Sequence, residues 1–236
     1  MWSKIASLML IPLPLLVAIT ASANGAYYGQ RFCQYDHVKC VLTKKGDSWY
    51  SLFPKAEKRD IIRRLNRMNT PLRPGVTIAI PHDIDSMQLM DISPFQYRIE
   101  APQQKLLLVN LDRLAWGAYD PDGNLIRWGP LSGGKSWCPD VKRPCRTVAG
   151  NFSIIRKKGA GCISSKYPLP RGGAAMPYCM FFFRGFALHG SDTVPGYHAS
   201  HGCVRLFHED AKWLNEDFID LPGNGLRGTK VIVMRT

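Results

Sequence analysis

The residues best suited to chemistry gather in one short stretch near the C-terminus. They are His189 and Gly190, a ten-residue spacer after His189, and then Ser200, His201, Gly202, Cys203, Val204 and Arg205. A thiol is a useful nucleophile only as the thiolate, and a free cysteine has a pKa of about 8.5, so Cys203 needs an imidazole or a positive field beside it. The neighbouring histidines and the arginine offer both. The stretch therefore predicts nucleophilic catalysis by Cys203 with His189 as its base.

Two other interpretations of these residues stay open. A single cysteine in a protein core usually serves packing alone. Alternatively, Cys203 and the histidines at positions 189, 198, 201 and 208 supply enough ligands for zinc. An exported chain with an odd cysteine count, and without a carboxylate or Cys-x-x-Cys ligand set, fits zinc less well. We therefore expect no metal and no other cofactor.

The cysteine count supports a free thiol. Seven cysteines in an exported chain predict three disulfides and one thiol left over. Six cysteines can form three disulfides in about 15 different pairings. The sequence spacing favours three local pairs, Cys33 with Cys40, Cys138 with Cys145, and Cys162 with Cys179, which leaves Cys203 free.

The start of the chain predicts export. Lys4, the apolar run 8–19 and the small residues 21–23 are typical of a signal peptide over residues 1–23. Pro12 and Pro14 interrupt the apolar run, which is too short to span a bilayer, so we expect cleavage and no stable membrane insertion. The periplasm, the wider cell envelope and release into the medium all stay open.

The net charge indicates an anionic environment. The formal charge is +13, and the mature chain would keep +12 once Lys4 is removed. This favours an anionic surface or polymer as partner. Export, and the lack of a recognition helix, zinc finger or aromatic RNA-binding pattern, argue against nucleic acid.

The elements that must position these residues are mostly strands. Strand-like runs begin at residue 105, and Asp120-Pro121-Asp122-Gly123 is a strong hairpin turn signal. Late in the chain, Phe207, Ala211, Leu214 and Phe218 share one helical face that could cover the sheet. We expect a mainly β catalytic domain over residues 105–236 with one covering helix.

The N-terminal part predicts a separate small α+β module over residues 37–82. The expected order is strand, helix, helix, strand, with one helix from about residue 56 to 68 and Pro71, Pro74 and Gly75 turning the chain into the closing strand. Residues 83–104 lack periodicity and contain Pro94 and Pro102, so they are predicted to be a linker.

Residues 105–236 resemble the L,D-transpeptidase catalytic domain of the YkuD type, whose signature is a histidine followed after a spacer by Ser/Thr-His-Gly-Cys-x-Asn/Arg. Flanking segments agree in order: LLLVNLDRLAWGAYDPDGNLIRWGPLSGG, TVAGNFSIIRKKG, MPYCMFFFRGFALHG and SHGCVRLFHEDAKWL. The resemblance implies a β-sandwich enzyme that acts on peptidoglycan stem peptides. It forms a thioester with a tetrapeptide donor, releases the terminal D-amino acid, and transfers the acyl group to a stem amine or a lipoprotein.

The resemblance also implies a role for each matching residue. Cys203 would be the nucleophile and His189 the general base and acid, with the carbonyl of Gly190 orienting its ring. His201 and Gly202 would border the oxyanion site. Arg205 would hold the substrate's carboxylate. Ser200 belongs to the substrate-binding segment, where its hydroxyl is expected mainly to fix the turn.

Three departures from the family pattern accompany the match. The segment 191–199 is several residues shorter than usual, which predicts a more open cleft. The usual threonine-proline appears as Thr147-Val148, and the flanking cysteine pairs are additional. The same machinery with water as acceptor would be an L,D-carboxypeptidase or a cross-link hydrolase, and a non-catalytic wall-binding protein is a more distant alternative.

The N-terminal module resembles the LysM glycan-binding module. The runs KKGDSWYSLF, LNRMN and LRPGVTIAIP occur in the order found in that family, over about 44 residues. The resemblance implies binding of glycan strands that contain N-acetylglucosamine. The alternative is a small fold that packs on the catalytic domain and binds no glycan, which the arginine-rich second helix and the extra cysteine pair keep open.

Overall fold

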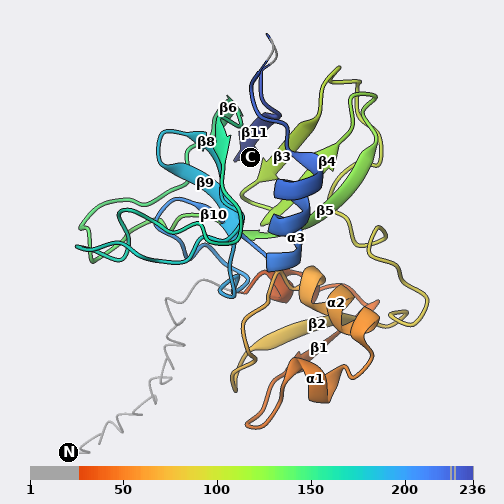
Figure 1. Cartoon of the computed structure of the whole chain (residues 1–236). Coiled ribbons are helices and arrows are strands. Elements are labelled where there is room, and N and C mark those ends of the chain that lie inside the picture. The colour runs from red at the N-terminus through yellow and green to blue at the C-terminus, as the bar shows by residue number, and fades with distance from the viewer. Residues whose placement is uncertain (1–26, 224, 226, 236) are drawn as a thin grey trace, which may run out of the picture.

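The structure is a computed structural model that describes residues 27–223, 225 and 227–235. The predicted signal peptide, residues 1–23, lies outside the described residues. The chain forms a small N-terminal unit with a two-stranded sheet and a larger unit with a nine-stranded sheet. The small unit lies beneath the larger one in Figure 1.

The small unit has the predicted order of strand, helix, helix and strand. Its elements are η1 (Tyr28–Phe32), β1 (Val38–Leu42), α1 (Trp49–Leu52), α2 (Ala56–Leu65) and β2 (Thr77–Pro81). β1 and β2 pair antiparallel along their full length. Ser48 caps α1 in a capping box with Ser51. Trp49, Ile62 and Ile78 form the core between the helices and the sheet. The likeness to LysM stays a prediction.

The larger unit is built on nine strands. They are β3 (Leu106–Asn110), β4 (Ala115–Tyr119), β5 (Leu125–Ser132), β6 (Gly150–Ser153), β7 (Arg156–Lys157), β8 (Met180–Phe183), β9 (Phe186–Gly190), β10 (Val204–Leu206) and β11 (Lys230–Met234). Their order in the sheet is β6-β11-β3-β4-β5-β10-β9-β8-β7. The predicted hairpin at residues 120–123 joins β4 to β5, which pair antiparallel.

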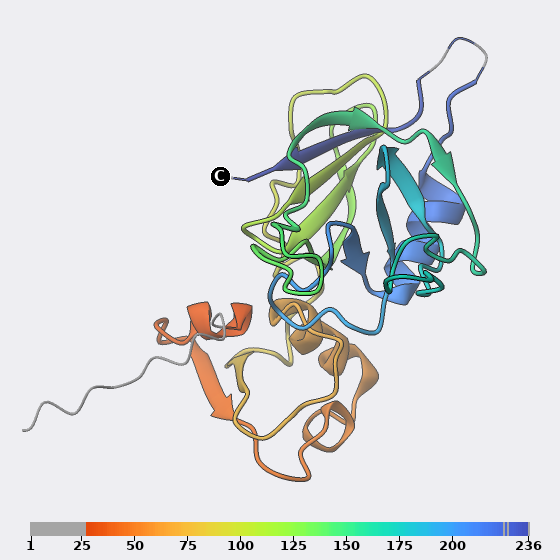
Figure 2. The ribbon, with the colours of Figure 1, turned by 90° about the vertical axis from the view of Figure 1, so that its left-hand side faces the viewer.

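The mainly β fold is confirmed, and its sheet is continuous. In the expected β-sandwich, two sheets pack face to face. Here the two packed layers are the halves of one curled sheet, because β10 pairs with β5 as well as with β9. In Figure 2 the half of the sheet that contains β3, β4 and β5 diverges from the half that contains β8 and β9. One core joins them, with Trp116 and Leu131 from the first half and Phe182 and Leu188 from the second.

The predicted covering helix is present between these halves. α3 (His208–Trp213) continues into a π-helical turn, η2 (Leu214–Phe218). The four residues predicted to share its inner face, Phe207, Ala211, Leu214 and Phe218, are all buried. In Figure 1 this helix stands in front of the sheet. α3 packs against β9, the strand that carries His189.

The segment 83–104 contains no helix or strand, as expected for a linker, but it packs closely on the sheet. Trp128 Nε1 donates to the Leu89 carbonyl (2.9 Å), and the Tyr119 hydroxyl donates to the Gln96 carbonyl (2.8 Å). Phe95 and Ile99 cover a second apolar cluster with Trp128. This segment is therefore a cover for the outer face of the β3, β4 and β5 half.

A buried ion pair joins the small unit to the sheet unit. Arg64 of α2 donates to both oxygens of Asp210 in α3, at 2.8 and 3.0 Å. Arg127 of β5 donates to the same carboxylate at 2.9 Å. The Asp210 side chain is fully buried, and that of Arg64 is 4% exposed. These charges fix α2 against the helix that covers the sheet.

Asp210→Asn is expected to lower the free energy of unfolding by about 3 kcal/mol, because it removes the buried carboxylate shared by Arg64 and Arg127 and leaves Arg64 paired only with the part-exposed Asp60 and Glu209. Urea unfolding monitored by tryptophan fluorescence measures this change. Asp217→Asn is the matched control, since Asp217 is exposed on the adjoining turn, and it should change stability by less than about 0.5 kcal/mol. Equal stability of the two variants would show that the pair does not hold the units together.

The three predicted disulfides are confirmed. Cys33 bonds to Cys40, Cys138 to Cys145 and Cys162 to Cys179, and Cys203 is the free cysteine of the described residues. Three disulfides fit an oxidising, extracellular location. Within the described part of the chain, the helices are all too short or too polar to serve as a membrane span.

Candidate active site

The strand register explains why the candidate catalytic residues lie on the same face of the sheet. β9 and β10 are parallel, with Leu188 opposite Val204 and His189 opposite Arg205. Leu188 and Val204 are fully buried in the core between the two halves of the sheet. Because side chains alternate along a strand, His189 and Arg205 point to the opposite face, together with Cys203 just before β10. Diagonal neighbours on one face lie about 7–8 Å apart between Cα atoms, within reach of a ring and a thiol.

The ring of His189 is held by the residue that follows it. Its Nδ1 lies 2.9 Å from the Gly190 carbonyl oxygen. A carbonyl only accepts, so Nδ1 carries the proton and Nε2 is left as the acceptor. The pKa of His189 is lowered to about 4, mainly by burial and in part by the positive charge of Arg205, while the hydrogen bond with the Gly190 carbonyl acts in the opposite direction. The imidazole is therefore neutral at neutral pH.

Cys203 is a protonated thiol at rest. Burial raises the pKa of Cys203, and a hydrogen bond with the Ala187 backbone and the charge of Arg205 offset part of this effect. Its Sγ–H donates to the Gly185 carbonyl at 3.7 Å. The resting site therefore holds a neutral thiol and a neutral imidazole, so a thiolate at Cys203 would need a base to take its proton.

These pKa values predict an unusual pH dependence. Because the pKa of His189 is depressed, its basic form persists to low pH, so kcat/KM should fall only as pH drops through about 4. Because the pKa of Cys203 is raised, alkylation of the free enzyme by iodoacetamide should be slow at pH 7 and accelerate only in the alkaline range. Rates of both reactions between pH 3 and 10 test this. An acid limb near the ordinary histidine pKa would contradict the burial of His189.

The turn before Cys203 is fixed by Ser200. The Ser200 hydroxyl donates to the Cys203 carbonyl and accepts from the Gly202 N–H at 3.0 Å. Gly202 has φ +127°, and a Cβ there would lie 2.9 Å from the Phe186 ring, so only glycine fits. The expected turn-fixing role of Ser200 matches this geometry. A role of the Gly202 N–H as an oxyanion donor would require its bond to Ser200 to open.

Thr147 supports the same turn and was not singled out as a site residue in the sequence. Its hydroxyl donates to the Gly202 carbonyl (2.8 Å) and accepts from the Gly134 N–H (2.8 Å). Thr147 is 4% exposed. The segment after β5 is thereby tied to the residue preceding the nucleophile. The family resemblance named Thr147 only as the threonine of the usual threonine-proline pair. Its contacts with Gly134 and Gly202 join separate segments, so the sequence pattern does not reveal them.

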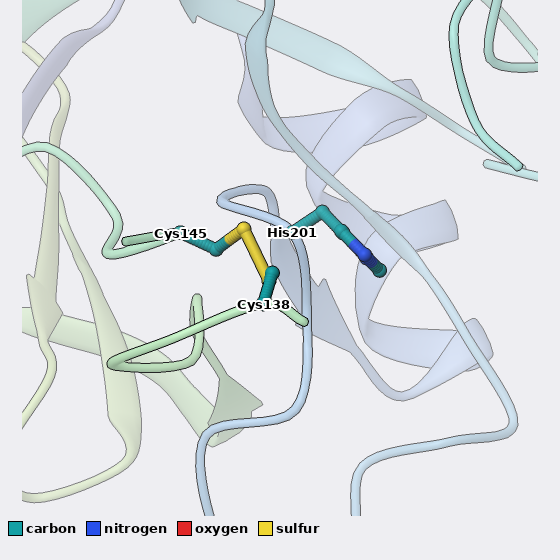
Figure 3. A group of neighbouring side chains, drawn as sticks. All are labelled: Cys138, Cys145 and His201. Carbon is teal, nitrogen blue, oxygen red and sulfur yellow. A yellow bond between two sulfur atoms is a disulfide. The ribbon is translucent and has the colours of Figure 1, made fainter. Parts of the chain in front are cut away.

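His201 has different partners from those of His189. Its Nε2 pairs with Asp140 Oδ2 at 2.8 Å, and its ring lies 4.7 Å from that of Tyr167. Figure 3 shows His201 beside the Cys138–Cys145 disulfide. These three residues are the one group of potential metal ligands found among the described residues. Both sulfurs are bonded to each other, so they are not available as thiolate ligands, and the group does not fit a metal ion.

The remaining histidines have partners of their own. His198 Nδ1 accepts from the Gly133 N–H (3.1 Å), and His208 Nε2 pairs with Asp192 (3.1 Å). Within the described residues, they do not form a ligand group with His189 and Cys203. The described structure therefore does not bring the four histidines and Cys203 together as a zinc site would require.

The catalytic candidates open into one cavity. Its volume is about 650 Å³, and its lining includes His189, Cys203 and Arg205 as well as Ser200, His201 and Gly202. This size is typical of a site for a small organic substrate. Arg205 is half-buried and its guanidinium makes a long contact, 3.4 Å, with the Thr193 carbonyl.

One wall of this cavity is held by the N-terminal unit. Asn69, just after α2, accepts from the Val194 N–H (2.9 Å) and donates to the Ser191 carbonyl (2.6 Å). The Tyr28 N–H donates to the Gly196 carbonyl (2.9 Å). Residues 194–196 are buried as a result. The short segment 191–199 is thus fixed between the two units, rather than left as an open loop.

Asn69→Ala is expected to lower kcat/KM about fivefold, mainly through KM, because losing these hydrogen bonds removes about 1 kcal/mol of loop positioning. The alkylation rate of Cys203 should stay within twofold, since neither His189 nor Cys203 is touched. Asn124→Ala is the matched control, because it removes an amide that donates to Asp120 in the hairpin turn. Loss of activity in both variants, or in neither, would contradict a positioning role for Asn69.

A free thiol and a buried neutral imidazole that line one cavity are the components of a nucleophilic cysteine–histidine site. The family model of the L,D-transpeptidase catalytic domain, YkuD, matches residues 104–233. The chain therefore belongs to the L,D-transpeptidase family, whose members are cysteine-dependent transferases acting on peptidoglycan stem peptides. The boundaries of the catalytic domain, residues 105–236, stay a prediction.

Individual relatives are distant. The chain is 23% identical over 154 residues to the probable L,D-transpeptidase ErfK/SrfK of Escherichia coli strain K12, covering 60% of this chain and 48% of the relative. It thus spans about half the length of that relative. The crystal structure of the L,D-transpeptidase, residues 123–326, from Xylanimonas cellulosilytica is similar in fold, with a TM-score of 0.52 and 21% identity over 74% of this chain and 78% of that one.

Proposed function

We propose that this chain is a peptidoglycan L,D-transpeptidase that uses Cys203 as nucleophile and His189 as general base and acid. The observation that carries the proposal is the arrangement of His189. Its Nδ1–H is bound to the Gly190 carbonyl, and its unprotonated Nε2 shares a cavity with the free thiol of Cys203. Membership of the L,D-transpeptidase family supplies the substrate class.

Acylation begins with the thiol leaving the Gly185 carbonyl and turning towards Nε2. The proton passes from Sγ to Nε2 as sulfur attacks the carbonyl between the third stem residue and the terminal D-amino acid. The C–N bond then breaks, and the imidazolium returns its proton to the leaving amine. The products are a thioester on Cys203 and a free D-amino acid. The Gly190 carbonyl stabilises the imidazolium between these steps.

Transfer reverses the proton path. An acceptor amine gives a proton to Nε2 while its nitrogen attacks the thioester carbonyl. The C–S bond breaks, and the imidazolium returns the proton to sulfur. No cofactor takes part. A stem amine gives a cross-link, whereas an amine of a lipoprotein attaches that protein to the wall.

Arg205 is suited to hold the carboxylate of the leaving D-amino acid. It lies on the same face as His189, is half-buried, and forms no ion pair with a carboxylate in the described part of the chain. A guanidinium can bind both oxygens of a carboxylate at once. His201 and Gly202 border the same cavity and are proposed to face the oxyanion side of the substrate.

Product analysis with a disaccharide tetrapeptide tests the reaction class. A transpeptidase yields cross-linked dimers and free D-amino acid, whereas an L,D-carboxypeptidase yields only tripeptide and D-amino acid, and a non-catalytic wall-binding protein yields neither. Mass spectrometry resolves all three outcomes. We expect dimers. Tripeptide alone would replace the transferase by a hydrolase with the same site, and unchanged tetrapeptide would contradict catalysis.

The surroundings of the reaction are proposed on the same basis. The net charge of +13 and the three disulfides support export to the periplasm or cell envelope and contact with anionic wall polymer. The strand, helix, helix and strand order of the N-terminal unit supports a LysM-like module that binds glycan strands. Its tight packing on the catalytic unit would place bound glycan at a fixed position relative to the cavity.

A further inference from the structure

Four positively charged side chains line the cavity in addition to the proposed catalytic residues. They are Arg143, Arg156, Lys158 and Lys166, called the cationic rim below. All four residues are exposed. The mechanism proposed above needs none of them, since Arg205 holds the leaving group's carboxylate. Their position along the cavity therefore points to a bound group other than the carboxylate of the leaving D-amino acid.

Two disulfide-closed loops hold the rim in place. Arg143 lies within the loop closed by Cys138–Cys145, and Lys166 within the loop closed by Cys162–Cys179. Arg143 donates to the hydroxyl of Tyr167 in the other loop at 3.3 Å, so the two loops meet. In Figure 1 the loops between β6 and β8 extend to the left of β9 and β10. Such covalent ties limit the reorganisation needed when a ligand binds.

The two remaining cations come from strand β7 and the residue after it. The guanidinium of Arg156 lies over the Phe181 ring at 3.4 Å, which fixes its position. Lys158 follows β7, and its backbone N–H donates to the Cys179 carbonyl at 2.9 Å. The rim therefore spans β7, the residue after it and both loops, and it lines the cavity that contains Cys203.

The charge of the rim is not neutralised. Among the described residues that line the cavity, there is no aspartate or glutamate. None of the ion pairs between described residues involves a rim side chain. With Arg205 the cavity carries five positive side chains and no acidic one. A cleft lined by one sign of charge concentrates ligands of the other sign.

We propose that the cationic rim is a carboxylate-binding subsite that selects donor stems with free carboxylates on the residues before the scissile bond. This inference rests on the proposed function and adds the chemical class of donor that the site prefers. Stems whose carboxylates are converted to carboxamides are poor donors, because they present the rim with neutral groups. The rim lies around Cys203, so the acyl part of the donor, which stays on the enzyme, is the part that it contacts.

Two synthetic tetrapeptide donors that differ only in carboxylate against carboxamide test the subsite. Acylation of Cys203 is followed by intact mass, and kcat/KM is measured for each donor. We expect the wild type to prefer the carboxylate donor by about tenfold at low salt, since several exposed charge pairs contribute modestly each. The preference should shrink as ionic strength rises.

The matched variants carry the same loss of charge in two places. The rim variant combines Arg143→Gln, Arg156→Gln, Lys158→Gln and Lys166→Gln. The control combines Lys44→Gln, Lys45→Gln, Lys55→Gln and Arg73→Gln, all exposed on the N-terminal unit. The rim variant should lose the preference and keep the rate with the carboxamide donor, while the control keeps both. Alkylation by iodoacetamide verifies that each variant retains its site.

The outcomes separate the two proposals. Equal use of both donors by the wild type, with Cys203 acylated, would overturn the subsite and leave the transpeptidase intact. A preference that the rim variant keeps, or that the control also loses, would place the discrimination elsewhere and overturn the subsite as well. Failure of both donors to acylate Cys203 would overturn the proposed function itself.

Discussion

Replacing His189 by glutamine is expected to lower kcat/KM for donor acylation by about 10²–10⁴-fold, the usual contribution of a general base. Glutamine can still donate to the Gly190 carbonyl, so the strand end should keep its structure. It cannot take the proton of Cys203, whose raised pKa leaves little thiolate at neutral pH. The rate of acyl-enzyme formation at pH 7 measures the effect. The loss should diminish at alkaline pH, where the thiol ionises without help.

His208→Gln is the matched control. His208 lies near the site but pairs with Asp192 through its Nε2 at 3.1 Å, and its side chain is 42% exposed. This variant should keep activity within about twofold and unfold at the same temperature as the wild type. If His189→Gln retained more than a tenth of the wild-type rate, another group would have to be the base.

Cys203→Ala is expected to abolish both cross-linking and tripeptide formation, because the other cysteines among the described residues are engaged in disulfides. Cys203→Ser should be nearly as inactive, since a hydroxyl is a much weaker acid than a thiol and His189 is a weak base. Product mass spectrometry after long incubation measures the residual rate.

Wild-type enzyme alkylated at Cys203 provides an independent control, because its backbone is unaltered. It should be as inactive as Cys203→Ala. Circular dichroism should show both proteins folded, since Cys203 is partly exposed and its contact with the Gly185 carbonyl is long, at 3.7 Å. Activity in the alanine variant would rule out Cys203 as the nucleophile.

The sequence was sufficient for the features that depend on local patterns. The residue types and the spacing of the motif indicated that His189 and Cys203 belong to one site, and both line one cavity. The four-three-four spacing from Phe207 to Phe218 predicted the buried face of the covering helix. Short separations along the chain predicted the disulfides, because nearby cysteines meet without a long loop to close.

Features that depend on contacts between distant segments could not be predicted. The bonds of Thr147 to Gly134 and Gly202 join three separate segments. Asn69 belongs to the small unit, yet its side chain holds the segment after His189. The pKa directions follow from burial, which a motif does not report. Likewise, the continuous sheet depends on β10 pairing with β5, more than 70 residues earlier by the register of Arg205 with Ser132.

The central claim is that the thiol of Cys203 becomes the acyl carrier after giving its proton to His189. Intact mass spectrometry of the wild type during turnover, followed by peptide mapping, tests it most directly. We predict a mass increase equal to the donor minus its terminal D-amino acid, located on Cys203 and released by hydroxylamine as expected for a thioester. D-Amino acid release without any adduct on Cys203, or an adduct on another residue, would contradict the mechanism.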